Sequence, residues 1–260
     1  MNNIGLKTFK DQLNRTINIS SPPKRIISLV PSQTELLFDL GLDEEIVGVT
    51  KFCIHPKDKF KCTTKIGGTK KINIQKIIDL KPDLIIGNKE ENDKQQIEEL
   101  MQYFPVWMSD IYTVDDALKM ILDISVICGK SEQGIQLVEA VKSGFETFNT
   151  EPLSGSFLYF IWKDPNYVAG TKTFISDLLE STGLRNLCRI ERYPEWNASD
   201  EVPDHILLSS EPYPFKLEHI KEMRKRYPNT MISLIDGEMC SWYGSRMQLA
   251  PKYLSAFFEK

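Results

Sequence analysis

The chain has 260 residues, of which 41% are hydrophobic and 26% are charged, an ordinary composition for a globular protein of one large or two small domains. Its 32 basic and 36 acidic residues leave a formal net charge of −4, which argues against a general nucleic-acid binder. No apolar run approaches the roughly 20 residues that a membrane-spanning helix needs.

The N-terminal segment MNNIGLKTFKDQLNR does not have the pattern of an export signal, because no apolar stretch follows a basic start. We expect a cytoplasmic protein if Met1 is the native start, and a periplasmic or surface-anchored one if a signal was removed. The five cysteines are scattered and include no Cys-x-x-Cys pair. This spacing predicts neither a structural zinc site nor a disulfide framework.

Strands and helices alternate in the first part of the chain. A β-branched run predicts a strand over residues 25–30. Ser32 and Glu35 have the spacing of a capping box, with Ser32 as the N-cap of a helix that ends at Gly41. The further predictions are strands at 46–50, 84–87 and 106–109 and helices at 73–81 and 91–103. This alternation is typical of a parallel α/β sheet.

Two helices are predicted in the middle of the chain, the first from Thr113 to about residue 128 and the second from Ser131 to about residue 149. Apolar residues of the second helix recur every three or four positions, which gives one buried stripe. About eighteen residues at ~1.5 Å each span roughly 27 Å. The second helix is therefore long enough to connect two lobes as a rigid strut.

The pattern restarts after residues 152–155, and part of it repeats the first half. Pro82-Asp83 precedes an apolar strand and Glu90, as Pro203-Asp204 precedes a strand and Glu211. The further predictions are strands at 156–161, 205–210 and 231–236 and helices at 173–181, 217–226 and 249–258. We predict an N-terminal α/β lobe over 1–112, a helical connection over 113–150 and a C-terminal α/β lobe over 151–260. The alternative is that Pro-Asp is only a common strand-entry turn.

Four segments together resemble a known family: PPKRIISLVPSQTELLFDLGL, IVGVTKF, GGTKKINIQKIIDLKPDLIIGN and YVAGTKTFISDLLESTGLRN. They resemble the helical-backbone (class III) periplasmic substrate-binding proteins of iron-siderophore, haem and vitamin B12 ABC transporters, closest to the vitamin B12 branch. The resemblance implies two Rossmann-like lobes, each with a parallel sheet, bridged by one long helix. It also implies a ligand cleft between the lobes, a monomer and an ABC permease as partner.

The resemblance assigns candidate ligand contacts by position. The loop Pro31-Ser32-Gln33 falls where the vitamin B12 branch touches its ligand, and Phe52 falls at a tyrosine near the metal centre. The other implied contacts are Asn88, Trp196, Glu238 and Trp242. Family members dock on their permease through a glutamate of each lobe. The first position is Gln75 here, a departure that puts docking in doubt, and the second corresponds loosely to Glu195 or Glu201.

Residue types near the predicted strand ends indicate a ligand site independently of the resemblance. Aromatic faces such as Trp162, Trp196, Trp242 and Tyr243 suit flat macrocycles, and the alternative is that they fill a hydrophobic core. Arg246 could donate to an anionic ligand. Glu90 and Glu211 fall where open α/β sheets bind ligands, and they could hold a cation or be solvated helix starts.

Two further groupings remain open on sequence alone. Cys53 and His55 could supply an axial ligand to cobalt or iron, or two ligands to zinc; the alternative is a buried thiol beside a surface histidine. Lys70 and Lys71 could attract an anionic ligand or lie in a solvated loop.

The sequence carries no GxSxG, P-loop, GxGxxG or HExxH motif, so we predict a protein without catalytic residues and without an intrinsic cofactor. The predicted function is binding of a metal chelate as the substrate-binding component of an ABC-type uptake system. Cobalamin is the first candidate ligand, followed by haem or a ferric siderophore. The alternatives are a cytoplasmic cofactor-handling protein or enzyme on the same fold, and a binder of a bare metal ion.

Overall fold

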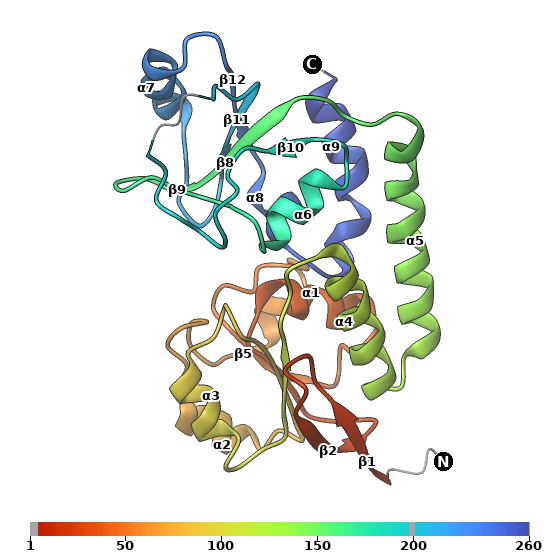
Figure 1. Cartoon of the computed structure of the whole chain (residues 1–260). Helices are drawn as coiled ribbons and strands as arrows, with labels where there is room; N and C mark the ends of the chain where they lie inside the picture. The colour runs from red at the N-terminus through yellow and green to blue at the C-terminus, as the bar shows by residue number, and fades with distance from the viewer. Residues whose placement is uncertain (1–4, 198–200, 260) are drawn as a thin grey trace. The chain divides into compact units, whose positions relative to one another are not determined.

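A computed structural model describes residues 5–197 and 201–259 (Figure 1). The chain divides into two units, which are described separately below. Unit 1 comprises Met1–Ile111, Asp115–Ala140 and Tyr243–Arg246, and unit 2 comprises Tyr112–Val114, Val141–Trp242 and Met247–Lys260. Among the described residues, no helix is both long enough and apolar enough to cross a bilayer.

Unit 1 is built on a parallel sheet with the strand order β5-β4-β3-β6-β7. The strands are β3 (Ile26–Ser28), β4 (Ile46–Val49), β5 (Thr64–Lys65), β6 (Leu84–Asn88) and β7 (Val106–Ser109). The helices that alternate with them are α1 (Pro31–Asp39), α2 (Ile74–Leu80) and α3 (Lys94–Leu100), and α4 (Val114–Ile127) follows β7. The parallel α/β sheet that the sequence predicts is confirmed.

Opposite faces of this sheet carry alternate residues of each strand, as the two-residue period of a strand requires. Ile27 and Ile85 pack with Ile77 of α2 and Ile97 of α3, in one buried apolar cluster. Both helices lie on the same side of the sheet (Figure 1). This burial on both faces explains why the strands read as continuous apolar runs.

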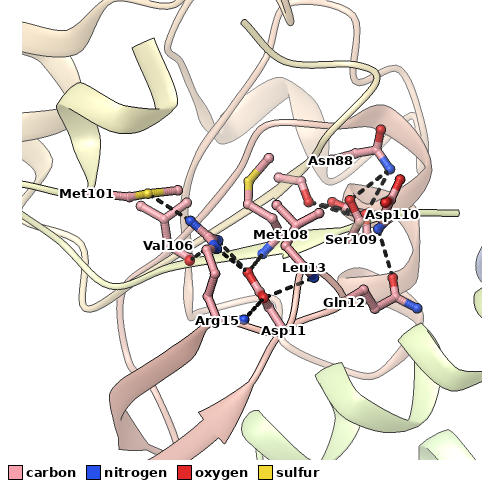
Figure 2. Close-up of polar contacts among 12 residues, drawn as sticks. Asp11, Gln12, Leu13, Arg15, Asn88, Met101, Val106, Met108, Ser109 and Asp110 are labelled. Atoms are coloured by element: carbon pink, nitrogen blue, oxygen red, sulfur yellow. Dashed lines mark hydrogen bonds and ion pairs between the residues drawn. The ribbon is translucent and has the colours of Figure 1, made fainter. Parts of the chain in front are cut away.

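An antiparallel hairpin precedes the sheet and was not predicted. It pairs β1 (Gly5–Lys10) with β2 (Thr16–Ser21). The turn between them is held by Asp11, whose carboxylate accepts the backbone N–H groups of Leu13 at 3.0 Å, Arg15 at 2.9 Å and Met108 at 3.3 Å (Figure 2). The Asp11 carboxylate also pairs with the Arg15 guanidinium, which donates to the Val106 carbonyl at 3.1 Å. Asp11 therefore fastens the hairpin to β7.

Unit 2 has a parallel sheet with the order β10-β8-β11-β12, and β9 adds to β8 antiparallel. Its strands are β8 (Ser156–Trp162), β9 (Tyr167–Val168), β10 (Arg185–Asn186), β11 (His205–Ser209) and β12 (Met231–Ile235). Its helices are α6 (Phe174–Glu180), α7 (Leu217–Arg226), α8 (Gly237–Ser241) and α9 (Ala250–Phe258). Apolar residues of β8, β11 and β12 pack with Phe215 and with Ile220 and Met223 of α7.

Three further elements remain: one helix and one 3-10 turn whose residues are divided between the two units, and one 3-10 turn in unit 1. Helix α5 (Ser131–Thr150) begins at the predicted residue. A 3-10 turn covers Ser245–Gln248, after α8. A second 3-10 turn, Phe60–Cys62, lies between β4 and β5.

The repeated Pro-Asp pair has the same structural role in each unit. Asp83 accepts the backbone N–H groups of Lys24 at 2.7 Å and Arg25 at 2.8 Å, just before β3. Asp204 accepts the backbone N–H and the hydroxyl of Ser156, both at 2.7 Å, at the start of β8. In each unit, therefore, the aspartate that precedes one strand is hydrogen-bonded to the start of the parallel strand beside it.

Some local predictions are wrong. Ser32 is not an N-cap: α1 begins one residue earlier, at Pro31, with Val30 as its N-cap and no side-chain cap. Proline is favoured at the first helical position because its ring presets φ and its missing N–H is not needed there. Helix α3 is shorter than the predicted 91–103, because Asp93 caps it by accepting the Gln96 N–H at 3.1 Å. Gly41 follows α1 with φ +75°, as predicted for a glycine that ends a helix.

Candidate functional site

A buried polar cluster lies at the carboxyl edge of the sheet in unit 1. Ser109, at the end of β7, accepts from Gln33 Nε2 at 2.6 Å and from Asn88 Nδ2 at 2.9 Å. Figure 2 shows Asn88 beside Ser109 at these strand ends. The side-chain oxygen Oδ1 of Asn88 accepts the backbone N–H groups of Glu90 at 2.8 Å and Glu91 at 3.0 Å. These bonds fix the loop in which Glu90 lies half-buried.

Gln33 retains one unused polar atom. Its Oε1 is buried and has no hydrogen-bond partner, whereas its Nε2 is bonded to Ser109. Buried polar atoms are nearly always bonded, so this oxygen is an exception among the described residues. Ser32 is also buried and Pro31 is half-buried. The three residues of the predicted ligand loop thus open α1 at the carboxyl edge of the sheet.

Phe52 lies in an open groove of about 800 Å³ on unit 1. Its side chain is 51% exposed, and the Lys51 ammonium lies 5.0 Å from the ring centroid. The rest of the groove is formed by the segment between β5 and α2, which includes Lys70 and Lys71. The sequence had singled out Phe52 and the lysine pair separately, and the structure brings them together.

Cys53 lies in the core and not in this groove. Its side chain is fully buried, and Sγ lies 3.1 Å from Thr34 Oγ1 and 3.2 Å from Thr50 Oγ1. Burial raises the pKa of the Cys53 thiol, and these hydrogen bonds offset the rise only in part. Because metals bind the thiolate, this environment does not favour metal ligation by Cys53. In the described part of the chain, no three His, Cys, Asp or Glu side chains are grouped as metal ligands.

The carboxyl edge of the sheet in unit 2 gathers three of the predicted residues: Glu211, Glu238 and Trp242. Glu211 follows β11, and its Oε1 accepts from the Ser241 hydroxyl at 2.9 Å and from Trp242 Nε1 at 2.8 Å. Burial is the main cause that raises the pKa of Glu211, and the neighbouring carboxylates of Glu238 and Asp236 add to it. The site therefore combines an indole, a hydroxyl and a partly buried carboxyl group.

The remaining predicted aromatic residues of unit 2 are placed differently. Trp162, at the end of β8, is 42% exposed and makes an edge contact with Tyr213 at 5.7 Å between ring centroids. Trp196 is half-buried against the apolar cluster of unit 2, and its Nε1 donates to the Tyr227 hydroxyl at 3.3 Å. Its indole N–H is thus already used, while the neighbouring Glu195 is exposed.

Arg246 is paired within unit 1. Its guanidinium donates twice to the Glu35 carboxylate, from Nε at 2.8 Å and from Nη2 at 2.6 Å. The side chains are only 8% and 14% exposed. A ligand carboxylate would have to share this guanidinium with Glu35. The sequence contains no signal for the pair, because its members are 211 positions apart. The neighbouring Tyr243 is also buried.

Comparison with known proteins places the chain in a family. Residues 26–223 match the family described as periplasmic binding protein. An ABC transporter substrate-binding lipoprotein of Bacillus subtilis is 30% identical over 193 residues, 69% of this chain and 60% of the relative. A vitamin B12-binding protein of Vibrio campbellii is 27% identical over 173 residues, 65% of this chain and 62% of the relative. The match thus spans about 60% of these relatives' own length.

Solved structures share the fold at lower identity. A possible iron-binding periplasmic solute-binding protein of Staphylococcus epidermidis matches with a TM-score of 0.78 and 24% identity, over 92% of this chain and 100% of its own. The vitamin B12-binding protein of Vibrio cholerae matches with a TM-score of 0.75 and 21% identity, over 92% and 97%. The resemblance inferred from sequence is confirmed, and the two-lobed α/β fold agrees with these neighbours. The chain belongs to the periplasmic binding protein family.

Proposed function

We propose that the protein binds a metal chelate without chemical turnover and acts as the substrate-binding component of an ABC-type uptake system. The observation that carries this proposal is the family match over residues 26–223, together with relatives named as vitamin B12-binding proteins. Cobalamin is therefore the first candidate ligand, and haem or a ferric siderophore comes next. The protein needs no cofactor of its own for this role and works as a monomer.

The proposed contacts lie at the carboxyl edges of the two sheets, each considered within its own unit. In unit 1 they are the α1 loop with the free Gln33 Oε1 and the exposed ring of Phe52. In unit 2 they are Trp162 and the group formed by Glu211, Glu238 and Trp242. Phe52 and Trp162 offer exposed aromatic surface, whereas Trp242 is buried and donates its indole N–H to Glu211. Aromatic surface with a few polar atoms is the usual lining of a small-molecule site.

A permease partner and an extracytoplasmic location belong to the same proposal. The relative in Bacillus subtilis is named a lipoprotein, which supports a surface location. Gln75 is exposed in the first turn of α2 and donates to Asp79 at 2.9 Å, so this turn presents an amide where the resemblance implies a docking carboxylate. Glu195 is exposed and is the docking candidate on unit 2.

Calorimetric titration of the purified apo-protein tests the proposal with cyanocobalamin, haemin and a ferric siderophore in separate runs. We expect submicromolar binding of one chelate and a loss of about fivefold or more in Trp242→Ala, because one aromatic contact contributes roughly 1 kcal/mol or more. Trp242→Phe retains the ring face and should bind more tightly than the alanine variant. Tyr103→Ala, an exposed aromatic residue that follows α3, is the control and should leave binding unchanged. The absence of heat with all three chelates would reject the proposal.

A further inference from the structure

The groove of unit 1 is strongly positive. Three lysines, Lys51, Lys70 and Lys71, line it, and the described residues that complete the lining include no Asp or Glu. In the described part of the chain, none of these three ammonium groups forms an ion pair. Lys70 donates to the Glu90 backbone carbonyl, which is a neutral acceptor, so this bond does not neutralise the ammonium group. The carboxylate of Asp93, which interacts with Lys70 electrostatically, is used to cap α3.

The groove lies at the same sheet edge as the proposed ligand contacts of unit 1. Lys51 and Phe52 follow β4, and the lysine pair follows β5, which pairs parallel with β4. The carboxyl ends of parallel strands form the ligand-binding edge in open α/β sheets. A volume of about 800 Å³ is within the range of small-molecule sites.

Two glycines allow the lysine-bearing loop to approach the ring. Gly67 has φ +113°, and a Cβ there would lie 2.6 Å from the Lys71 carbonyl oxygen. A Cβ on Gly68 would lie 3.1 Å from Phe52 Cε2. Any other residue at Gly67 would be strained, so the loop conformation that groups Phe52 with the ammonium groups depends on glycine.

We infer that this groove is a subsite for an anionic oxygen group carried by a flat ligand, with the anion on the lysines and the apolar surface on Phe52. The identification of that ligand as a metal chelate rests on the proposed function. The phosphodiester of a complete cobalamin, the propionates of haem and the oxygens of a ferric catecholate share this chemistry. A chelate that carries no anionic oxygen group does not use the subsite.

Matched ligand pairs test the inference on the whole chain. The pairs are cyanocobalamin with dicyanocobinamide, haemin with its dimethyl ester, and a ferric tris-catecholate with an uncharged ferric trihydroxamate. We expect the combined variant Lys51→Gln, Lys70→Gln, Lys71→Gln to bind the anionic member about tenfold more weakly, since each exposed ion pair contributes a small amount. Binding of the member that lacks the anionic oxygen group should change less than about twofold. Raising the salt from about 0.02 M to about 0.5 M should remove most of the difference.

A control variant separates local contacts from net charge. Lys57, Lys61 and Lys76 are exposed lysines of unit 1 outside the groove, and their combined change to Gln alters the net charge equally. This control should retain wild-type affinity for the anionic member. Equal losses in both triple variants, or no loss in the groove variant, would overturn the inference while the proposed function stands.

A small probe tests the subsite even if no chelate binds. We expect naphthalene-2,6-dicarboxylate to shift the backbone amide resonances of Gly67 and Gly68, whereas the uncharged dicarboxamide should leave them unchanged. The groove variant should lose the response to the dicarboxylate. If no chelate binds but the dicarboxylate gives this response, the proposed function fails and the subsite remains. Without that response, the inference is wrong whatever the chelates do.

Discussion

At the scale of single residues, the ion pair between Glu35 and Arg246 is the least solvated among the described charges that pair in unit 1. Both side chains are mostly buried, and the guanidinium makes two hydrogen bonds to the carboxylate. Removal of Glu35 takes two hydrogen bonds and the opposite charge away from a mostly buried guanidinium, and loss of one member of a buried pair costs more than the pair itself contributes. The pair also fixes the Tyr243–Arg246 segment to the rest of unit 1.

We therefore expect Glu35→Ala to lower the free energy of unfolding by about 3 kcal/mol. Urea unfolding followed by circular dichroism measures this change. Asp43→Ala is the control, because its pair with Lys59 is 50% and 39% exposed, and it should cost less than about 1 kcal/mol. The double variant Glu35→Ala, Arg246→Met should lose less stability than the sum of the losses in the two single variants. An additive result would show that the two charges do not interact.

Glu211 makes stability depend on pH. Its pKa is raised chiefly by burial, so the folded state holds the proton more tightly than the unfolded state does. The contribution of Glu211 to stability is therefore fully present below the ordinary carboxyl pKa and falls as the pH rises through the raised folded value. Trp242 and Ser241 stabilise the charged form by hydrogen bonding and limit this loss.

Glu211→Gln removes this titration and keeps an oxygen for the hydrogen bonds from Ser241 and Trp242. As the pH rises from about 4 to about 8, we expect the variant to become more stable relative to the wild type. The reason is that only the wild type loses stability with ionisation of this group. Urea unfolding at both pH values measures the difference, and all other carboxyl groups are common to both proteins. A difference that is independent of pH, or one that favours the wild type at high pH, would contradict the assigned environment.

At the scale of elements, helices of this protein begin in two different ways, with a side-chain cap or with a proline. Helix α2 is capped by Asn73, whose side chain accepts the Lys76 N–H at 2.9 Å, and α6 is capped in the same way by Thr173. Helix α1 has no side-chain cap and begins with proline. Its start is determined by the ring of Pro31 and by packing.

This difference predicts unequal effects of two alanine substitutions. Asn73→Ala should lower stability by about 1 kcal/mol, because the Lys76 N–H loses its partner. Ser32→Ala should cost less than about 0.5 kcal/mol, despite the capping-box spacing, because the hydroxyl caps nothing. Thermal unfolding of the two variants beside the wild type measures both effects. A larger loss in Ser32→Ala than in Asn73→Ala would restore the capping-box interpretation.

At the scale of the whole molecule, ligand binding and stability are linked. A ligand that binds only the folded chain stabilises it by about 2.7 kcal/mol at a concentration of 100 times its Kd. For a chain of this size we expect a rise in Tm of roughly 5–10 °C with the bound chelate. Differential scanning calorimetry at several chelate concentrations measures the rise, and Trp242→Ala should require more chelate for the same shift. A Tm that does not depend on concentration would contradict specific binding.

Hydrophobic periodicity was sufficient for much of the fold. It predicted the main strands of both parallel sheets and the helices between them, because buried strands and amphipathic helices carry their pattern locally. The repeated Pro-Asp pair was also informative, since Asp83 and Asp204 have equivalent bonds in the two units. The β1–β2 hairpin was missed because it depends on Asp11 contacts with a distant strand. Helix α8 and the strands β5, β9 and β10 were missed because they are only five and two residues long.

The sequence by itself determined the fold class, the family resemblance and the types of residue at the strand ends, because these depend on local pattern and on positions along one chain. The tertiary structure alone decided which candidates are available to a ligand. Cys53 is buried, Arg246 is paired with Glu35, and Phe52 shares a groove with three lysines. Burial and pairing depend on neighbours that are distant in sequence, so no local pattern could reveal them.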